Sequence, residues 1–370
     1  MATVRSCAGE LRSNARVDWD SRSNVTLNII DPTRDTRWDA FLGRHPAASV
    51  FHTPGWLEAL RRTYSYQPIA FTSSAAGHPL ADGIVCCGIS NWLGARRLVS
   101  LPFSDHCAPL VEDAGQLTGL LDSLRRNLVE GKWKRVEICV TDSIVSSCER
   151  FEKSAVFFLH KLDLAPPIEE IFGNLHKDCV QRKIRRAERE ELTYEEGTSE
   201  PLVGQFYRLL SMTRQRHGLP PQPLSWFRNL MACLGDRVKI RIALKNERPI
   251  TGILTLQYKR TLVYKYGCSD EKFSHLGGMQ SLLWKAIQDA KKAQLNELDL
   301  GRSECDNAGL VTFKDRWNAT RSRLVYLQYP RPSVHSIRST ARNSISKRVF
   351  AWMPNGLRAA TGRVLYKYMG

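Results

Sequence analysis

The sequence lacks a long hydrophobic run. It has no stretch of about 18 uninterrupted apolar residues, which is roughly what a membrane-spanning helix requires. Residues 1–16 contain Arg5, Glu10 and Arg12 and no apolar core, so they do not resemble a secretory signal peptide. We therefore expect a soluble protein that stays in the cytoplasm.

The ten cysteines lack the spacing of a metal or redox site. Apart from Cys86 and Cys87 they are scattered singly, with no C-x-x-C motif and no paired Cys/His spacing. Several lie in apolar, strand-like stretches, where a reduced cysteine packs as a small hydrophobic side chain. This usage is typical of the reducing cytoplasm, and we expect no bound metal.

Acidic residues are few relative to basic ones. The 370 residues include 54 Lys and Arg against 37 Asp and Glu, which gives a formal net charge of +17. Such an excess favours anionic partners, such as nucleic acid, nucleotides or an anionic membrane surface. Sequence-specific DNA binding is not expected, because no helix-turn-helix or zinc-finger signature occurs.

Length and local composition predict four segments. At roughly 150 residues per domain, the chain is long enough for two domains, and we place these at residues 25–165 and 166–330. Residues 1–24 are polar and without periodicity, which predicts a disordered leader. Residues 331–370 form a basic tail with eight Lys and Arg and no Asp or Glu. This tail suits contact with an anionic membrane, and a pair of packed helices broken at Pro354 is the alternative.

The two predicted domains repeat one order of elements. The first contains a helix over 53–64, strands over 68–72, 80–89 and 97–102, a helix over 114–129 and a strand over 135–140. The second contains helices over 202–216 and 226–233, strands over 238–244, 250–258 and 261–266, a helix over 277–293 and a strand over 297–300. This order predicts the α/β class, a mixed sheet with helices on both faces.

One further helix, over 168–190, is expected to carry a basic face. Its cations are Lys177, Arg182, Lys183, Arg185, Arg186 and Arg189. Arginine forms bidentate contacts with phosphate, so Arg182, Arg185 and Arg186 are candidates to bind a phosphate-bearing partner. A solvated face, partly neutralised by nearby glutamates, is the alternative.

The end of the strand over 297–300 carries the most specific group of polar residues. Ligands bind at the carboxyl ends of strands in open α/β sheets, which makes Arg302 a candidate to hold a phosphate or carboxylate. Lys314 lies between Phe313 and Trp317 and is a candidate to place positive charge against a developing oxyanion. A salt bridge from Arg302 to an aspartate, with Lys314 extending to solvent, is the alternative.

The strand over 261–266 and the segment after it supply a second group. Period two places Tyr264 and Tyr266 on one face, with Ser269 and Asp270 just beyond the strand. Gly277 and Gly278 then begin a helix whose free N–H groups are suited to a phosphate.

The histidines show no nucleophilic triad. His52, His106, His217 and His275 lie near the ends of predicted elements, and the sequence identifies no Ser or Cys partner for any of them. Structural or hydrogen-bonding roles are therefore expected for these side chains.

Several short stretches of the chain occur together in one known family. They are FHTPGWL (51–57) with Tyr64 and Tyr66, VSLPFSD (99–105), RKIRRAE (182–188), and LGRS (300–303) with FKDRW (313–317). As a set they resemble the Fem-related branch of the GNAT acyltransferase superfamily. That branch includes aminoacyltransferases of peptidoglycan bridges and acetyltransferase-like relatives associated with exopolysaccharide synthesis.

The resemblance implies a tandem duplicated GNAT-like fold and acyl transfer from a thioester or ester donor to an amine. Phe313 and Lys314 match the family's Phe-Lys motif, and Lys314 is the residue expected to stabilise negative charge during transfer. Arg302, Tyr266 and Asp270 are expected in the same cleft, with Asp270 as the candidate base. The run over 182–186 is expected to meet the phosphates of the donor or the acceptor.

Donor and acceptor stay open at this point. The donor is acyl-CoA, such as acetyl-CoA, or aminoacyl-tRNA, because residues 274–280 do not fit the usual acetyl-CoA loop, Gln/Arg-x-x-Gly-x-Gly/Ala. The expected acceptor is an anionic or lipid-linked cell-envelope precursor, either a peptidoglycan or an exopolysaccharide intermediate. The alternative is a non-catalytic GNAT scaffold for envelope-biosynthesis partners or polyanions. Convergence of Lys314, Arg302, Asp270 and Tyr266 on one cleft would favour the enzyme.

Overall fold

The computed structural model of the chain describes residues 26–90, 96–129, 133–148, 150–330 and 366–367. The expected leader and nearly all of the expected basic tail lie outside these residues. In the part that is described, no helix is both long and apolar enough to cross a membrane.

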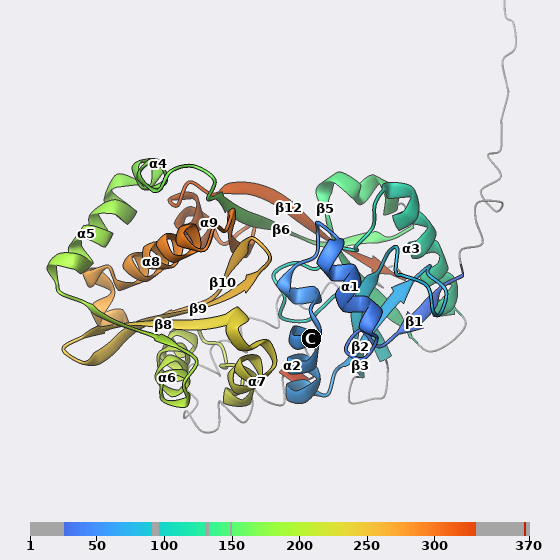
Figure 1. Cartoon of the computed structure of the whole chain (residues 1–370), viewed down its shortest axis with the longest axis horizontal. Coiled ribbons are helices and arrows are strands. Elements are labelled where there is room, and N and C mark those ends of the chain that lie inside the picture. Colours follow the sequence, from blue (N-terminus) through green and yellow to red (C-terminus); the bar gives the residue numbers. More distant parts are fainter. Residues whose placement is uncertain (1–25, 91–95, 130–132, 149, 331–365, 368–370) are drawn as a thin grey trace, which may run out of the picture.

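Twelve strands of the described chain form one continuous mixed sheet (Figure 1). They are β1 (Asn28–Ile30), β2 (Gln67–Thr72), β3 (Ile84–Ser90), β4 (Arg96–Val99), β5 (Arg135–Thr141), β6 (Glu152–Asp163), β7 (Thr193–Gly197), β8 (Val238–Lys245), β9 (Arg248–Tyr258), β10 (Thr261–Ser269), β11 (Glu297–Glu304) and β12 (Thr320–Tyr329). The α-helices are α1 (Thr36–Arg44), α2 (Pro54–Tyr64), α3 (Ala114–Val129), α4 (Ile168–Asn174), α5 (Arg182–Arg189), α6 (Glu200–Arg216), α7 (Leu224–Leu234), α8 (Gly278–Lys292) and α9 (Ala308–Asp315).

The pattern of antiparallel and parallel strand pairs is the same when it is followed inward from either edge of the sheet. One half runs β1-β2-β3-β4-β5-β12 and the other runs β7-β8-β9-β10-β11-β6. In each half the fourth pair, β4–β5 or β10–β11, is parallel and the other pairs are antiparallel. This symmetry confirms the α/β class and the repeated order of elements. The antiparallel pair β12–β6 joins the halves at the centre.

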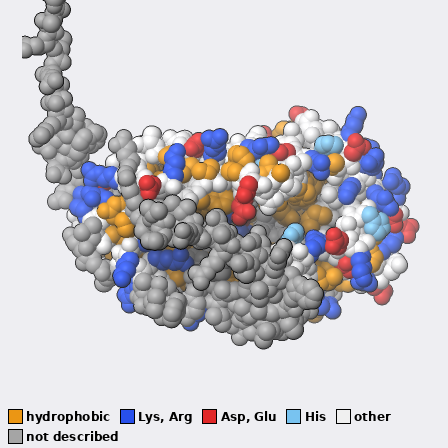
Figure 2. Space-filling model, turned by 180° about the vertical axis from the view of Figure 1, so that it is seen from behind, with side chains coloured by type: hydrophobic (Ala, Val, Ile, Leu, Met, Phe, Trp, Pro, Cys, Tyr) orange, Lys and Arg blue, Asp and Glu red, His pale blue; other side chains and the backbone are white. Residues whose placement is uncertain are grey.

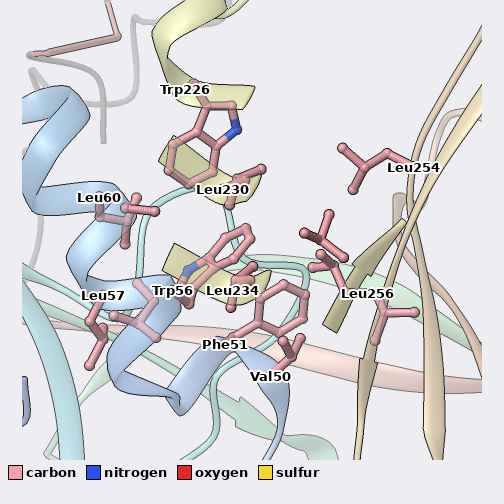
Figure 3. Packing of buried hydrophobic residues seen from close by; sticks show 14 of the residues in the cluster. Val50, Phe51, Trp56, Leu57, Leu60, Trp226, Leu230, Leu234, Leu254 and Leu256 are labelled. Atoms are coloured by element: carbon pink, nitrogen blue, oxygen red, sulfur yellow. The ribbon is translucent and has the colours of Figure 1, made fainter. Parts of the chain in front are cut away.

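Helices cover both faces of the sheet, as expected. Side chains of α1, α2, α6 and α7 pack on one face, whereas α3, α4, α5 and α8 pack on the other. The hydrophobic core under α1, α2, α6 and α7 contains residues from both halves of the sheet. Trp56 of α2 meets Trp226 of α7 edge to face, with ring centroids 5.2 Å apart, and Leu254 and Leu256 of β9 lie beside them (Figure 3). A methyl group at Gly55 would lie 2.5 Å from the carbonyl oxygen of Cys233, so glycine permits the close approach of α2 and α7.

The single helix expected over 168–190 is wrong. Helix α4 ends where Leu175 adopts an extended conformation, with φ −68° and ψ 146°. His176 then donates its backbone N–H to the carbonyl oxygen of Arg316, and its side chain caps a π-helical turn (Lys177–Gln181) that leads into α5. The helical spacing of apolar residues continues past Leu175, which is why one helix was expected. A tertiary contact, the hydrogen bond to Arg316, accompanies the end of α4 instead.

The common face expected for Tyr264 and Tyr266 is also wrong. The pairing of β10 with β9 shifts between these residues, so that Lys265 forms a bulge. A bulge adds one residue and reverses the alternation of faces beyond it. Tyr264 consequently packs with the α8 side of the sheet and Tyr266 with the α7 side.

Candidate functional site

The two parallel strands of the second half separate after a short pairing. Strand β10 pairs with β11 only at residues 261–263 with 297–299. Past this point β10 carries the bulge at Lys265, and β11 shifts its register against β6 between Asp299 and Arg302. Gly301 lies within that shift, with φ +74°, a conformation that favours glycine. Charged side chains from both halves of the molecule meet where the two strands separate.

Asp105 reaches the end of this pairing from the loop after β4. Its Oδ2 atom lies 2.7 Å from Nζ of Lys265, and a methyl group on Gly301 would lie 2.9 Å from its Oδ1 atom. The Lys265 ammonium also lies 5.4 Å from the ring centroids of Phe51 and Tyr266. Burial lowers the pKa of Lys265 below its ordinary value even though Asp105 raises it. Asp105 thus links β10 of one half to a loop of the other.

His106, the next residue, pairs with the strand on the other side. Its Nε2 atom lies 2.7 Å from Oδ2 of Asp299, and Oδ1 of Asp299 accepts the backbone N–H of Gly301 at 2.7 Å. The side chain of Asp299 is 1% exposed and that of His106 is 16% exposed. Burial alone raises the pKa of Asp299, but His106 and the Gly301 N–H outweigh it and lower the pKa overall. Asp299 is therefore a buried carboxylate behind a partly exposed imidazole.

Lys314 reaches the same place from α9. Asn307 caps this helix by accepting the backbone N–H of Leu310 at 3.1 Å. The Lys314 ammonium donates to the carbonyl oxygens of Gly301 at 2.8 Å and Arg302 at 2.9 Å, and the residue is 2% exposed. Burial lowers its pKa to about 8. A lysine has three N–H donors, so one is left for a further acceptor.

The side chain of Arg302 lies against β6 and β12. Its guanidinium donates to the hydroxyl of Tyr326 and lies 4.6 Å from the ring centroid of Phe157. Arg302 therefore does not form the salt bridge to an aspartate that was the alternative from the sequence. Arg302 joins the group through its carbonyl oxygen, which accepts from Lys314.

A cavity of about 410 Å³ lies between the two halves, and of the site residues above His106 and Asp299 are in its lining. The first half contributes residues 46–50 and His106 to its lining. The second half contributes residues 258–261, Val263, Asn296, Glu297 and Asp299, and Lys161 of β6 completes it. Small-molecule sites commonly measure about 300–1,000 Å³. The cavity is therefore large enough for part of a substrate, and the His106–Asp299 pair forms part of its wall.

Two residues predicted to share the cleft, Tyr266 on β10 and Asp270 just after it, lie at different distances from the Lys314 group. The ring of Tyr266 lies against Lys265, while its hydroxyl donates to Oε1 of Gln222 at 2.6 Å and accepts from Trp226. Asp270 lies five residues beyond Lys265, roughly 16 Å along an extended strand. It caps the short helix Glu271–Leu276 and pairs with Arg248 at 2.9 Å. The structure thus brings Lys314, Arg302 and the Tyr266 ring together and leaves Asp270 at the end of the strand.

The side chains or backbones of the remaining predicted residues make other contacts. Ser269 is fixed to α6, because its backbone N–H donates to Oγ1 of Thr213 at 2.9 Å. Phe313 packs with Trp317 in the core on the α8 side of the sheet. Gly277, with φ +81°, precedes α8, and a methyl group there would lie 2.2 Å from the carbonyl oxygen of Lys183. Glycine at this position therefore lets α5 pack against the start of α8.

The three arginines predicted to meet phosphate lie on α5. Arg182 pairs with Asp178, Arg186 pairs with Glu190, and Arg185 lies over the ring of Phe172. All three are exposed. Lys and Arg side chains are frequent at this end of the molecule, with acidic side chains between them (Figure 2). The structure thus brings the basic residues of α5 next to the predicted glycines at the start of α8.

Sequence reasoning missed Asp105, His106, Lys265 and Asp299 as site residues. His106 and Asp299 are 193 positions apart, and no local pattern relates them. The only early sign of Asp105 was its place in the VSLPFSD stretch. Lys265 reaches Asp105 from the bulge, which the sequence pattern does not indicate.

Part of the chain matches known proteins in sequence. Residues 176–314 match the family model described as acetyltransferase (GNAT) domain. The UDP-N-acetylmuramoylpentapeptide-lysine N(6)-alanyltransferase of Weissella viridescens is 25% identical over 146 residues, which cover 38% of this chain and 43% of that protein. The chain thus matches less than half the length of this relative.

Two solved structures share the fold over most of the chain. The crystal structure of FemX has a TM-score of 0.65 at 14% identity and covers 82% of this chain and 97% of that one. A tandem GNAT protein from the clavulanic acid biosynthesis pathway has a TM-score of 0.50 at 9% identity and covers 83% and 100%.

The class follows from this fold and these matches: the molecule has the fold of tandem GNAT-like units, and residues 176–314 match the GNAT domain model. Within that class, the chain is similar in sequence to this alanyltransferase and in fold to FemX, in line with the resemblance of its motifs to the Fem branch.

Proposed function

We propose that the chain is an N-acyltransferase. It transfers an acetyl or aminoacyl group from acyl-CoA or aminoacyl-tRNA to an amine of a cell-envelope precursor, either a peptidoglycan or an exopolysaccharide intermediate. The proposal draws on the GNAT domain and on a relative whose name describes alanyl transfer to a lysine of a peptidoglycan precursor.

The arrangement of Lys314 carries the proposal. Acyl transfer to an amine passes through a tetrahedral species with a negative oxygen, and a fixed donor in a water-poor site stabilises that charge. Lys314 is buried where β10 and β11 separate, and two backbone carbonyls hold its ammonium in place. This leaves its third N–H free to donate to the developing oxyanion. Phe313 precedes it in the motif and packs α9 into the core.

The charge around the site suits phosphate-bearing substrates. Lys161, Lys259 and Arg260 line the cavity, against Glu297 and Asp299. An acceptor with a phosphate or carboxylate near its amine would meet favourable charge there. The arginines of α5, together with the start of α8 at Gly277 and Gly278, are our candidates to hold the donor's phosphates.

A transfer assay tests this function. The purified chain is incubated with acetyl-CoA or alanyl-tRNA, and with UDP-N-acetylmuramoylpentapeptide or an amino-sugar oligosaccharide. Mass spectrometry of the acceptor measures the transferred group. We expect one donor to add one acyl mass to an amine of one acceptor. A chain that binds these compounds but transfers nothing from either donor would contradict the proposal and favour a non-catalytic scaffold.

A further inference from the structure

An amine acceptor must lose a proton before it can attack. Aliphatic amines are mostly ammonium ions near neutral pH, and an ammonium has no free electron pair. The base predicted from the sequence, Asp270, is engaged by Arg248 and by the first turn of a short helix at the end of β10. The site therefore needs another group at the cavity that accepts a proton.

We propose that His106, held by Asp299, is the base that removes this proton from the acceptor amine. The inference rests on the proposed function, because it assigns a step of that reaction. It also places the acceptor's amine in the cavity between the two halves and leaves Lys314 to the acyl oxygen.

The geometry fixes one ring nitrogen of His106 as the acceptor. Asp299 is a buried carboxylate, and a carboxylate only accepts hydrogen bonds. Nε2 of His106 therefore carries the proton that Asp299 accepts at 2.7 Å, so that the lone pair of the neutral imidazole lies on Nδ1. Phe51 meets the imidazole edge to face at 5.3 Å and 90°, which holds the ring from the first half. A buried carboxylate that orients a histidine and stabilises its protonated form is a recurrent arrangement for proton transfer.

Other histidines of the described chain lack this combination. His52 is completely buried, both its nitrogens have partners in Ser49 and Ala108, and burial lowers its pKa to about 4. His160 is also fully enclosed, and His78 is exposed on a turn. Among these, His106 alone joins a buried carboxylate partner to a position in the cavity wall.

Lys314 and Asp299, the partner of His106, are both hydrogen-bonded to the backbone of Gly301. Gly301 donates its N–H to Asp299 and accepts from Lys314 through its carbonyl oxygen. The proposed base and the proposed oxyanion donor are thereby held in a fixed relation. The charged and titratable groups around His106 are Asp105, Asp299, Lys161, Lys265 and His52.

The proposed step balances as follows. His106 Nδ1 takes one proton from the ammonium, and the freed electron pair forms a C–N bond with the acyl carbon. The C–S bond of a thioester, or the C–O bond of an aminoacyl ester, then breaks. Its sulfur or oxygen takes a second proton from the attacking nitrogen, which leaves an amide. The protonated His106 returns its proton to water after the product has formed.

Kinetics of matched variants test the assignment. General bases contribute about 10²–10⁴-fold to rates, so we expect His106→Gln to lower kcat by at least about 100-fold. Its remaining rate should rise steadily with pH, because the acceptor must then lose its proton to solvent. Asp299→Asn should cause a similar loss, and imidazole added to His106→Gly should restore part of the rate. His78→Gln, on the exposed turn, should match the wild type.

Nuclear magnetic resonance of ¹⁵N-labelled histidine supplies a measurement that does not depend on activity. We expect His106 to carry its proton on Nε2 and to lose this preference in Asp299→Asn. A proton fixed on Nδ1 would overturn the proposal. So would His106→Gln with wild-type kcat and an unchanged pH profile, and in that case the transfer function itself would stand. Absence of transfer by the wild-type chain would instead count against the proposed function.

Discussion

Replacement of Gly301 by alanine tests the geometry on which the site depends. The residue has φ +74°, where an L side chain costs roughly 1–2 kcal/mol. The added methyl group would also lie 2.9 Å from Oδ1 and 3.0 Å from Cγ of Asp105. Lys265 holds that carboxylate, so it cannot withdraw freely, and such overpacking typically costs about 1–3 kcal/mol. We expect a total loss of about 2–5 kcal/mol in the free energy of unfolding, measured by urea denaturation.

Gly77→Ala is the matched control. Gly77 has a similar φ of +81°, and a methyl group there would have no neighbour within 4 Å. It should therefore lose only the backbone contribution and keep its activity, whereas Gly301→Ala should also lose activity as Asp105 is displaced. Equal losses of stability in the two variants would refute the claim that Asp105 packs against Gly301.

Three further predictions address charge, packing and donor binding. Burial lowers the pKa of Lys314 from 10.5 to about 8, so the unfolded chain binds the extra proton between these values. Wild-type stability should therefore rise from pH 8 to about 10.5 by up to about 3 kcal/mol relative to Lys314→Met, and parallel pH profiles in urea denaturation would contradict this. Trp56→Ala should cost about 3–5 kcal/mol and shift a single calorimetric transition, because its core spans both halves; two separate transitions would contradict it. If tRNA is the donor, alanine at the three arginines of α5 should weaken binding and reduce the salt dependence of log K by about one per lost phosphate contact. Arg34→Ala, an exposed control, should not, and identical salt slopes would exclude a role for α5.

Local sequence signals predicted the repeated elements well. Helix α3 has both of its predicted ends. Helix α2 begins where Thr53 accepts the backbone N–H of Trp56 and Pro54 occupies the first turn, as expected from such residues. These features depend on neighbours in the chain, so the sequence alone is informative about them.

The centre of the sheet was not predicted. Strands β6 and β12 pair with each other at the centre of the sheet. Strand β12 is the last described strand in the sequence, yet it also pairs with β5 of the first half. Neither was expected, because their pairing depends on partners far away in the sequence. The boundaries at residues 25–165 and 166–330 stay predictions.

Only part of the candidate site was predicted, because the rest also depends on contacts between distant parts of the sequence. Arg302 lies on strand β11 and Lys314 follows soon after it on α9, and the motif around them drew attention to both. The His106–Asp299 pair joins residues 193 positions apart, and Asp105 reaches Lys265 only because β10 has a bulge. Tertiary packing determines these contacts, and no local periodicity reveals them.

The most direct test of the central claim is the single-turnover rate of acyl transfer by Lys314→Met. The rate is compared with that of the wild type at saturating donor, after circular dichroism has established that both are folded. Removal of one oxyanion donor typically lowers the rate by about 10²–10³-fold, and we expect a loss of this size with donor affinity retained. A rate equal to that of the wild type would contradict the claim that acyl transfer occurs where β10 and β11 separate.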